Sequence, residues 1–566
     1  MSVTRQKVGK YTYLYDSKSF WDKIKKQPDN DKIPIGKIDL HTGEPVYKQD
    51  YLDKMAASGE SIEGMRLWDK SREARGMVGA GANTVNETAL AEAILDSVRD
   101  FGVVYFIREL TEMIGLAEIL QDTIPGATEE VFALACYLIA QDKPVMYCEE
   151  WVASNFGLNT GSMSSQRVSD LLVSFGCAER NNFYRRWQEK ISSREYIALD
   201  ITSVSSYSQQ ISACEWGYNR DGEDLAQINI CMLFGMDSKL PVYQTMYSGS
   251  LGDVKTLRAT MCEFATMTGS KELTVIMDKG FYSEGNVDIL LGRSDDGLSI
   301  RFLIAVPFSS NLAYDWIGIE QTNIDRLENV ILTSGQPVRG VHRQNEWGGI
   351  MLNTHVFFNP EKAAKERNEL FRYVTVLKQQ AEEDPDNRKN AAAYNKYLRI
   401  EKHRKGSSVK IRENEVDWEL ETVGWFVLIS NYINDTQTAH DMYRAKDVVE
   451  KGFMRYKNNL GLDRLRVHGD ERLENKLFIV FIALIITSAI HETMKRKNLY
   501  KQITFDSLFL TLAKLKIASM NGKQILRPIT KEQTDILKAF DIRLPDYSTC
   551  KASTPKKRGR KPKVGK

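Results

Sequence analysis

The chain lacks most of the patterns by which redox, metal and membrane proteins are recognised from sequence. Its seven cysteines include no C-x-x-C pair and lie mostly in apolar contexts, so we interpret them as reduced structural thiols of a cytoplasmic protein. The seven histidines show no metal-ligand spacing. No signal peptide is expected. The most apolar run, Leu477–Ile490, is too short to span a bilayer and is predicted to be a buried helix.

The chain also has no large excess of charge of either sign. Its 77 Lys and Arg nearly balance its 75 Asp and Glu, so the net charge is only +2. Any surface that binds nucleic acid must therefore be local. The apolar fraction of 42% and charged fraction of 27% are typical of a soluble globular protein. A length of 566 residues is too great for one core, so about three or four domains are expected.

One segment, Asp441–Leu460, combines an unusual polar face with an apolar one. It has no proline and a single internal glycine, which predicts a helix. At about 100° per residue, one face carries Tyr443, Lys446, Glu450 and Lys457. The opposite face can pack on a sheet, with the glycine allowing close approach, and carries Val448, Val449, Gly452 and Tyr456. Cations around one carboxylate suit a site for a metal and a phosphodiester; a solvated charged face is the alternative.

Two aspartates upstream are predicted at the ends of strands. Tyr196–Leu199 is an apolar run followed by Asp200, and Leu273–Met277 is a second one followed by Asp278. Strand-end carboxylates can converge with a glutamate from a later helix on a pair of hard cations, and Mg²⁺ prefers oxygen ligands. The alternative for each aspartate is that it caps a turn or a helix.

Taken together, these motifs resemble those of the DDE transposases of bacterial insertion sequences, in the group with a Y-x2-R-x3-E-x6-K signature around the catalytic glutamate. The signature is present here as Tyr443, Lys446, Glu450 and Lys457, and the D-x-G-[FY] pattern as Asp278, Gly280 and Phe281. Lysine at 446 replaces the arginine of the family pattern, which keeps the charge but loses the bidentate fork. The resemblance covers roughly residues 190–490.

The resemblance implies a fold and an activity. The fold is an α/β ribonuclease-H-like core, a mixed sheet flanked by helices, interrupted by an insertion domain. Asp200, Asp278 and Glu450 would be catalytic and would hold two Mg²⁺ ions, for which Mn²⁺ can substitute. Tyr443, Lys446 and Lys457 would bind DNA phosphates. The activity implied is cleavage at terminal inverted repeats and strand transfer into target DNA, which is cut-and-paste transposition of an insertion sequence.

The same resemblance implies the partners and the location. Double-stranded DNA is the partner, both as inverted repeats and as target. Two ends must be brought together, so a homodimer in a synaptic complex is expected. The location implied is the bacterial cytoplasm, in association with the nucleoid and without a membrane.

The chain divides into six predicted regions. The catalytic core is predicted as three antiparallel strands followed by parallel ones, with the strand Trp425–Ser430 returning before the glutamate helix. The regions are a small β-rich region (1–80), a helical DNA-binding domain (85–190), the core (191–307 and 424–495), the insertion domain (308–423), a helical C-terminal region (496–550) and a disordered basic tail (551–566).

Further DNA contacts are predicted outside the core. A recognition-type helix near Ser164–Phe175 carries Arg167, and Arg185 and Arg186 follow it; a purely structural bundle is the alternative. In the insertion, Trp347 or Trp316 would stack on a flipped base, unless each is an ordinary core residue.

The tail is the last predicted DNA contact. Its Arg558-Gly559-Arg560-Lys561-Pro562 matches an AT-hook core, in which the arginines enter a narrow minor groove. A disordered basic tail that binds phosphates without preference is the alternative.

Two other functions remain open at this point. The chain could be a DNA-binding protein derived from a transposase, or a stand-alone nuclease on the same fold. A glycosidase needs only two carboxylates, but it leaves the basic face of the glutamate helix without a role.

Overall fold

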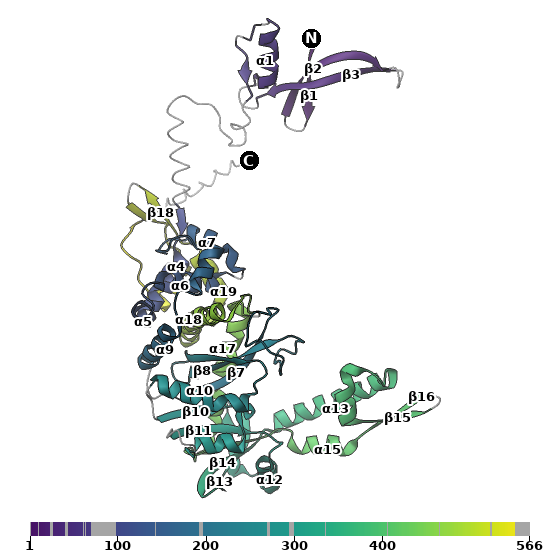
Figure 1. The fold of residues 1–566 in the computed structure, drawn as a ribbon, viewed down its shortest axis with the longest axis vertical. Coiled ribbons are helices and arrows are strands. Elements are labelled where there is room, and N and C mark those ends of the chain that lie inside the picture. Colours follow the sequence, from purple (N-terminus) through teal and green to yellow (C-terminus); the bar gives the residue numbers. More distant parts are fainter. Residues whose placement is uncertain are drawn as a thin grey trace, which may run out of the picture. The chain divides into compact units, whose positions relative to one another are not determined.

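In the computed structural model the chain forms two compact units, Met1–Ser97 and Val98–Lys566 (Figure 1). The described residues lie between 2 and 549, except for 9–10, 23–26, 40–42, 60, 63, 69–97, 142, 192–195, 269–271, 294–298, 334–335, 404–405, 463 and 521–522.

The first unit is built on a sheet with strand order β1-β2-β3-β4-β5. Its first three strands form an antiparallel meander, and its buried residues include Leu14, Ile35 and Leu52. The elements are β1 (Ser2–Val8), β2 (Tyr11–Asp22), β3 (Gln27–Ile38), β4 (Pro45–Tyr47), α1 (Gln49–Ala57) and β5 (Arg66–Leu67).

The second unit begins with a strand and a group of helices. The sequence predicts a helical domain over 85–190, but Val98–Asp100 form strand β6, which pairs with β18 (Lys516–Met520). That part of the prediction is wrong, because pairing with a distant segment overrides the local helical pattern. The helices are α4 (Gly102–Met113), α5 (Leu116–Thr123), α6 (Thr128–Ala140), α7 (Cys148–Ser154), α8 (Ser165–Leu171) and α9 (Cys177–Ile191).

A long apolar helix, α18 (Asp470–Arg496), holds these helices against the sheet. The predicted buried run Leu477–Ile490 lies within it, and that prediction is confirmed. Phe478 makes edge contacts with Phe175 and Phe183, so the helices and the sheet share one hydrophobic core. Among the described residues α18 is the one helix that is long and apolar enough to cross a membrane, but 83% of its apolar window is buried inside the protein. Its apolarity is therefore that of a core helix.

The central sheet has strand order β12-β13-β14-β17-β11-β10-β7-β8-β9. Strands β7, β8 and β9 are antiparallel, β10 and β11 run parallel to β7, and β17 is antiparallel to β11. This confirms the predicted mixed sheet. Its core elements are β7 (Ile197–Ser205), β8 (Gln227–Gly235), β9 (Pro241–Ser248), α10 (Asp253–Thr268), β10 (Glu272–Met277), β11 (Ser299–Val306) and β17 (Trp425–Ser430).

Residues 308–423 contribute both to this sheet and to a second core. Three strands extend the sheet beyond β17: β12 (Val330–Thr333), β13 (Gln336–Trp347) and β14 (Ile350–Phe358). Val374, Leu377 and Tyr397 belong to the separate core. The elements around it are α13 (Pro360–Glu383), α14 (Ala391–Tyr397), β15 (Leu398–His403), β16 (Gly406–Ile411) and α15 (Glu413–Thr422) (Figure 1).

The C-terminal region, predicted to be helical, also contains a hairpin. Strand β18 pairs with β19 (Lys523–Leu526), between helices α19 (Phe505–Leu512) and α20 (Lys531–Ala539). The residues between the two strands are Asn521-Gly522, a dipeptide that strongly favours a hairpin. That signal was present in the sequence and was missed.

A buried histidine in β14 makes the stability of this sheet depend on pH. His355 is fully buried, and its Nε2 lies 3.0 Å from the carbonyl oxygen of Ile433. Burial lowers the pKa of His355 to about 4. The folded-state pKa is below the ordinary value of about 6.5. The stability that neutral His355 contributes to the folded protein is therefore fully present above about pH 6.5 and is lost as the pH falls through 4. The loss amounts to about 3 kcal/mol in the free energy of unfolding.

Replacing His355 by glutamine is expected to reduce this acid sensitivity, since glutamine keeps a donor but does not titrate. Urea unfolding at a series of pH values measures the effect. The exposed His468 is the matched control, and His468→Gln should leave the pH dependence unchanged. An equally steep loss of stability in His355→Gln would contradict the assignment.

Candidate active site

The helix predicted at 441–460 is interrupted at the residue that matters most to the site. Helix α16 (Thr436–Ala445) ends before Lys446, and α17 (Asp447–Met454) begins after it. A π-helical turn, Arg455–Asn459, follows α17. The Lys446 N–H donates to the Tyr443 carbonyl and the Val449 N–H donates to the Lys446 carbonyl, both over three residues. This tighter turn corrects the prediction of one continuous helix.

The apolar face of α17 packs on the sheet, as predicted. Val449 and Tyr456 are buried, and the Tyr456 hydroxyl donates to Gln244 at 2.8 Å. A Cβ atom at Gly452 would lie only 2.3 Å from Cζ of Phe234 in β8. The absence of a side chain at Gly452 therefore sets how closely the helix that carries Glu450 approaches the sheet.

Replacing Gly452 by alanine is expected to destabilise the protein by about 1–3 kcal/mol, because Phe234 or the helix must move. The same shift should displace Glu450 and slow any reaction that depends on it. Thermal unfolding and a cleavage assay measure the two effects. Shortening the opposing ring, in Gly452→Ala with Phe234→Leu, should restore part of both. Unchanged stability and activity in Gly452→Ala would show that the contact carries no constraint.

The three predicted carboxylates converge on one ammonium group. The Lys446 Nζ lies 3.8 Å from Oδ2 of Asp200, 3.8 Å from Oδ2 of Asp278 and 3.6 Å from Oε1 of Glu450. Asp278 follows strand β10, as predicted, and caps the turn Lys279–Phe281. Asp200 lies within β7, since that strand continues to Ser205 and pairs with β8 throughout, which corrects the predicted strand end.

The free oxygens of the two aspartates face the same point. Oδ1 of Asp200 accepts from the Ile201 N–H at 2.8 Å, and Oδ1 of Asp278 accepts from the Lys279 N–H at 2.7 Å and from the Tyr443 hydroxyl at 2.8 Å. In each aspartate the other oxygen, Oδ2, faces Lys446. The protein thus holds one oxygen of each carboxylate and leaves the second for a cation.

The two aspartates differ in their electrostatics. Burial raises the pKa of Asp200 to about 6, against the opposing effect of the Lys446 charge. Burial also acts to raise the pKa of Asp278, but Lys446, the Lys279 N–H and Tyr443 together outweigh it, so that pKa lies below its ordinary value. Burial and the neighbouring Asp278 raise the pKa of Tyr443, which therefore stays a neutral donor.

The ammonium group of Lys446 is itself unusual. The residue is 3% exposed, and among the described residues no acceptor lies within hydrogen-bond distance of its Nζ. A buried charge without hydrogen bonds is costly, and here only the surrounding carboxylates offset that cost. The Lys446 ammonium group therefore occupies the position between the three carboxylates where a positive charge is most stabilised.

The three carboxylates are of the right chemical type to bind a divalent cation, but in this structure they are too far apart to enclose one. The carboxylate oxygens are the ligands that Mg²⁺ prefers. However, no group of three His, Cys, Asp or Glu in the described part of the chain is close enough to enclose a metal ion. Glu450 has a side chain that is 62% exposed, so it is free to change rotamer. Lys446 takes the place that a cation would share with the carboxylates.

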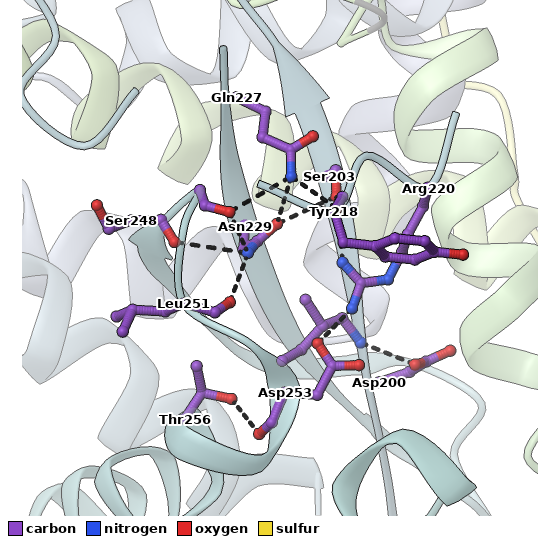
Figure 2. Close-up of polar contacts among 12 residues, drawn as sticks. Asp200, Ser203, Tyr218, Arg220, Gln227, Asn229, Ser248, Leu251, Asp253 and Thr256 are labelled. Carbon is purple, nitrogen blue, oxygen red and sulfur yellow. Dashed lines mark hydrogen bonds and ion pairs between the residues drawn. The ribbon is translucent and has the colours of Figure 1, made fainter. Parts of the chain in front are cut away.

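A second polar network, missed by the sequence reasoning, lies beside Asp200. Arg220 donates to Ser203 at 3.1 Å and forms an ion pair with Asp253 (Figure 2). A Cβ at Gly280 would touch the Asp253 carboxylate, which places this network next to Asp278. Arg220 lies in a loop outside the sequence motifs around Asp200, Asp278 and Glu450, so no local sequence pattern could have identified it.

The third predicted phosphate ligand lies apart from Lys446. Lys457 is in the π-helical turn and forms an ion pair with Asp221, at 2.6 Å. This pair ties the loop that carries Arg220 to the segment that follows Glu450. Tyr443, Lys446 and Glu450 come together as predicted, whereas Lys457 contacts a partner that the sequence did not reveal.

The other predicted DNA-contacting residues are paired within the protein. Arg167 bonds to Glu130 and Arg185 to Glu189, and Arg186 bonds to Asp122. Both members of the Arg185 and Arg186 pairs are exposed, whereas Glu130, the partner of Arg167, is only 15% exposed. Exposed ion pairs are weak, so phosphates can replace the acidic partners of Arg185 and Arg186 at little cost. The Trp347 indole donates to Asp288 at 2.9 Å, and Trp316 packs partly buried on the core. The predictions for Arg558 and Arg560 lie outside the described residues.

Comparison with known proteins places this geometry in a family. A family model described as a transposase DDE domain matches residues 191–486, which include all three carboxylates and the lysine between them. The chain belongs to this family of DDE transposases. The match spans β7 to α18, so it includes the sheet, residues 308–423 and the glutamate helix.

Other comparisons add less to this transposase assignment. A comparison with curated proteins finds no match. Among solved structures, the chain is similar to one described as a cryo-EM structure of a piggyBac transposase synaptic complex with hairpin DNA. The similarity covers 68% of this chain and 70% of that one, at 10% sequence identity and a TM-score of 0.36. This level of likeness carries no argument about the site.

Proposed function

We propose that this DDE transposase cleaves DNA at the inverted-repeat ends of an insertion sequence and joins those ends to target DNA. The observation that carries the proposal is the convergence of Asp200, Asp278 and Glu450 on one buried cationic position. Three carboxylates around a single positive charge form a site that a divalent cation can take over once the lysine moves. Phosphoryl transfer needs such positive charge beside the reacting phosphate.

Each side chain has a distinct task in this proposal. Asp200, Asp278 and Glu450 would hold two Mg²⁺ ions, or Mn²⁺ in their place, and these supply a nucleophile and stabilise the leaving oxygen. The Tyr443 hydroxyl keeps Asp278 oriented, so that its Oδ2 stays available. Lys446, released from the carboxylates, is then free to neutralise a phosphate next to the scissile bond. Lys457 would exchange Asp221 for a phosphate in the same way.

The proposal extends to the rest of the DNA. Arg167, Arg185 and Arg186 lie on helices α8 and α9 and would contact the repeat, and Trp347 would stack on a base. Arg558 and Arg560 would enter the minor groove from the tail. Because two ends must react together, the active form would be a homodimer on two repeats.

The test uses duplexes copied from the DNA on either side of the gene, end-labelled and incubated with the protein and Mg²⁺. The expected result is a nick at the repeat end that leaves a 3′-hydroxyl, followed by a joined product when target DNA is added. EDTA should abolish both products. The absence of any metal-dependent cleavage of flanking duplexes that the protein binds would overturn the proposal.

One observation favours a second candidate, a DNA-binding protein that no longer transposes. If Lys446 remains a permanent counter-ion, the carboxylates are already neutralised and bind no metal. In that case, Mg²⁺ should neither stabilise the protein nor alter its DNA binding. Metal-dependent thermal stabilisation therefore separates the two candidates.

A further inference from the structure

Arg220, in the segment between β7 and β8, is a cation that the reaction described above does not use. Its guanidinium is held on two sides. It donates to the Ser203 hydroxyl at 3.1 Å and forms an ion pair with Asp253, the first residue of α10 (Figure 2). The side chains of Arg220 and Asp253 are only 23% and 21% exposed. Solvent ions screen such a partly buried pair much less than a surface pair, so the guanidinium has a defined position.

The residues on either side of Arg220 are also held in place. The Asn219 side chain donates to Ser205 at 2.9 Å, and its Oδ1 accepts from the Asp221 N–H at 2.8 Å. The Asp221 carboxylate in turn pairs with Lys457, in the π-helical turn after α17. The backbone around Arg220 is thus fixed to β7 and to that turn, so a ligand that binds the guanidinium has little chain left to order.

The pair of Arg220 and Asp253 lies beside both aspartates of the site. A Cβ atom at Gly280, two residues after Asp278, would come within 2.8 Å of Oδ2 of Asp253. The Arg220 charge also acts on Asp200: burial raises the pKa of that carboxyl to about 6, and Arg220 is among the groups that oppose the rise. The absence of a side chain at Gly280 therefore leaves room for a carboxylate that holds a guanidinium next to the site.

Arg220 keeps donors that the protein does not use. An arginine has five N–H groups, and among the described residues the hydrogen bonds of Arg220 go to Ser203 and Asp253. The other N–H groups can donate to two oxygens of one phosphate, a bidentate contact that an ammonium group does not make. Lys446, which also lies beside the aspartates, has only an ammonium group. The guanidinium thus offers the site a contact that Lys446 cannot supply.

We propose that Arg220 binds a DNA phosphate at the site through two parallel N–H···O bonds, and that Asp253 is the positioning residue that holds the guanidinium for this contact. This inference rests on the proposed function, because it assigns a role within the same site. It also gives Gly280 a role, since a side chain there would displace Asp253 and, through it, Arg220.

The test pairs a change in the protein with a change in the DNA. Duplexes copied from the DNA beside the gene carry a neutral methylphosphonate in place of one phosphate at a time. Binding is measured in Ca²⁺, which takes carboxylate ligands. We expect one replacement to weaken binding by the wild type about tenfold, because charge-assisted bidentate contacts are strong. Arg220→Gln should bind the unmodified duplex about tenfold more weakly and lose about twofold or less on the same replacement.

Two further variants separate phosphate binding from a defect in folding. Arg220→Gln leaves the Asp253 carboxylate without its partner, which costs stability. Arg220→Gln with Asp253→Asn instead leaves two neutral groups that can hydrogen-bond to each other, so its thermal midpoint should stay close to that of the wild type. This double variant should show the same insensitivity to the methylphosphonate. Arg220→Lys keeps the charge but not the fork, and should still bind the unmodified duplex more weakly than the wild type.

Arg464 provides the matched control. It is also an arginine, and it pairs with Glu223 of the same segment at 2.6 Å. Arg464→Gln therefore removes a cation that holds this segment without touching Arg220. It should keep the full wild-type sensitivity to the methylphosphonate, whatever its affinity for the unmodified duplex. An equal loss of that sensitivity in Arg464→Gln and Arg220→Gln would contradict a specific contact of Arg220.

The outcomes distinguish this inference from the proposed function. If the wild type cleaves flanking duplexes but Arg220→Gln and the double variant keep the full methylphosphonate penalty, Arg220 only ties its segment to α10. The inference is then overturned and the proposed function stands. If the penalty depends on Arg220 but no metal-dependent cleavage occurs, the proposed function fails and the phosphate contact remains. If no single methylphosphonate weakens binding by the wild type, the inference is likewise overturned.

Discussion

Replacing Glu450 by glutamine is expected to lower the rate of metal-dependent DNA cleavage by about 10³-fold or more. A metal ligand contributes several kcal/mol to transition-state stabilisation, and each 1.4 kcal/mol corresponds to about tenfold in rate. Glutamine keeps the shape of the side chain, and the Glu450 side chain is 62% exposed, so folding and DNA affinity should change little. Single-turnover cleavage of labelled flanking duplexes measures the effect.

A neighbouring carboxylate provides the matched control. Asp447 lies in the same helix, α17, and pairs with Lys451 on the surface. Asp447→Asn removes one negative charge from that helix without touching the site, so cleavage should stay within about threefold of the wild type. If Glu450→Gln cleaves cognate ends as fast as Asp447→Asn, Glu450 is not a catalytic residue and the assignment of the site fails.

Replacing Lys446 by methionine is expected to make the stability of the protein depend on divalent cations. Methionine fills a similar volume but leaves Asp200, Asp278 and Glu450 facing one another without a positive charge. Loss of one partner from a buried ionic cluster costs about 3–5 kcal/mol, and the exposure of Glu450 reduces that to roughly 2–3 kcal/mol here. A cation bound between the carboxylates would replace the missing charge.

Thermal unfolding with and without Ca²⁺, which takes carboxylate ligands, measures this dependence. The expected result is a low midpoint for Lys446→Met in EDTA and a rise of several degrees on adding Ca²⁺, larger than in the wild type. Lys457→Met is the control, because it breaks the pair with Asp221 away from the carboxylates and should show no added metal response. An equal response of Lys446→Met and the wild type would show that lysine and metal do not compete for one place.

The parts of the site that the sequence predicted are those set by local pattern. Asp278 follows an apolar run and precedes a glycine, and Gly452 lies opposite the polar face of its helix, so both roles could be inferred from spacing. The strands β7 to β11 and β17 are also readable as apolar runs between turns. Residue type and spacing are enough to predict the role of a residue wherever its interaction partners lie within one or two helical turns along the chain.

The parts that were missed depend on contacts between distant segments. The pairing of Lys457 with Asp221 and that of Arg220 with Asp253 join loops and helices far apart in sequence. The extension of β7 beyond Asp200 is fixed by its pairing with β8, and β6 is a strand only because β18 lies beside it. The interruption at Lys446 likewise lies where this side chain meets carboxylates from two other segments of the chain. Helical periodicity alone contains none of this information.

The core shared by α18, the preceding helices and the sheet has a consequence for where DNA would be cut. Phe175, which follows α8, and Phe183 of α9 pack directly on Phe478 of α18, so these segments share one hydrophobic core with the strands of the sheet. If those helices grip a repeat, the span between the gripped base pairs and the reacting phosphate is fixed by side-chain packing. The distance between the bound repeat and the cleaved phosphate is then constant. Cleavage should therefore occur at a fixed number of base pairs from the bound repeat, even when the DNA sequence between the repeat and the cleavage position is changed.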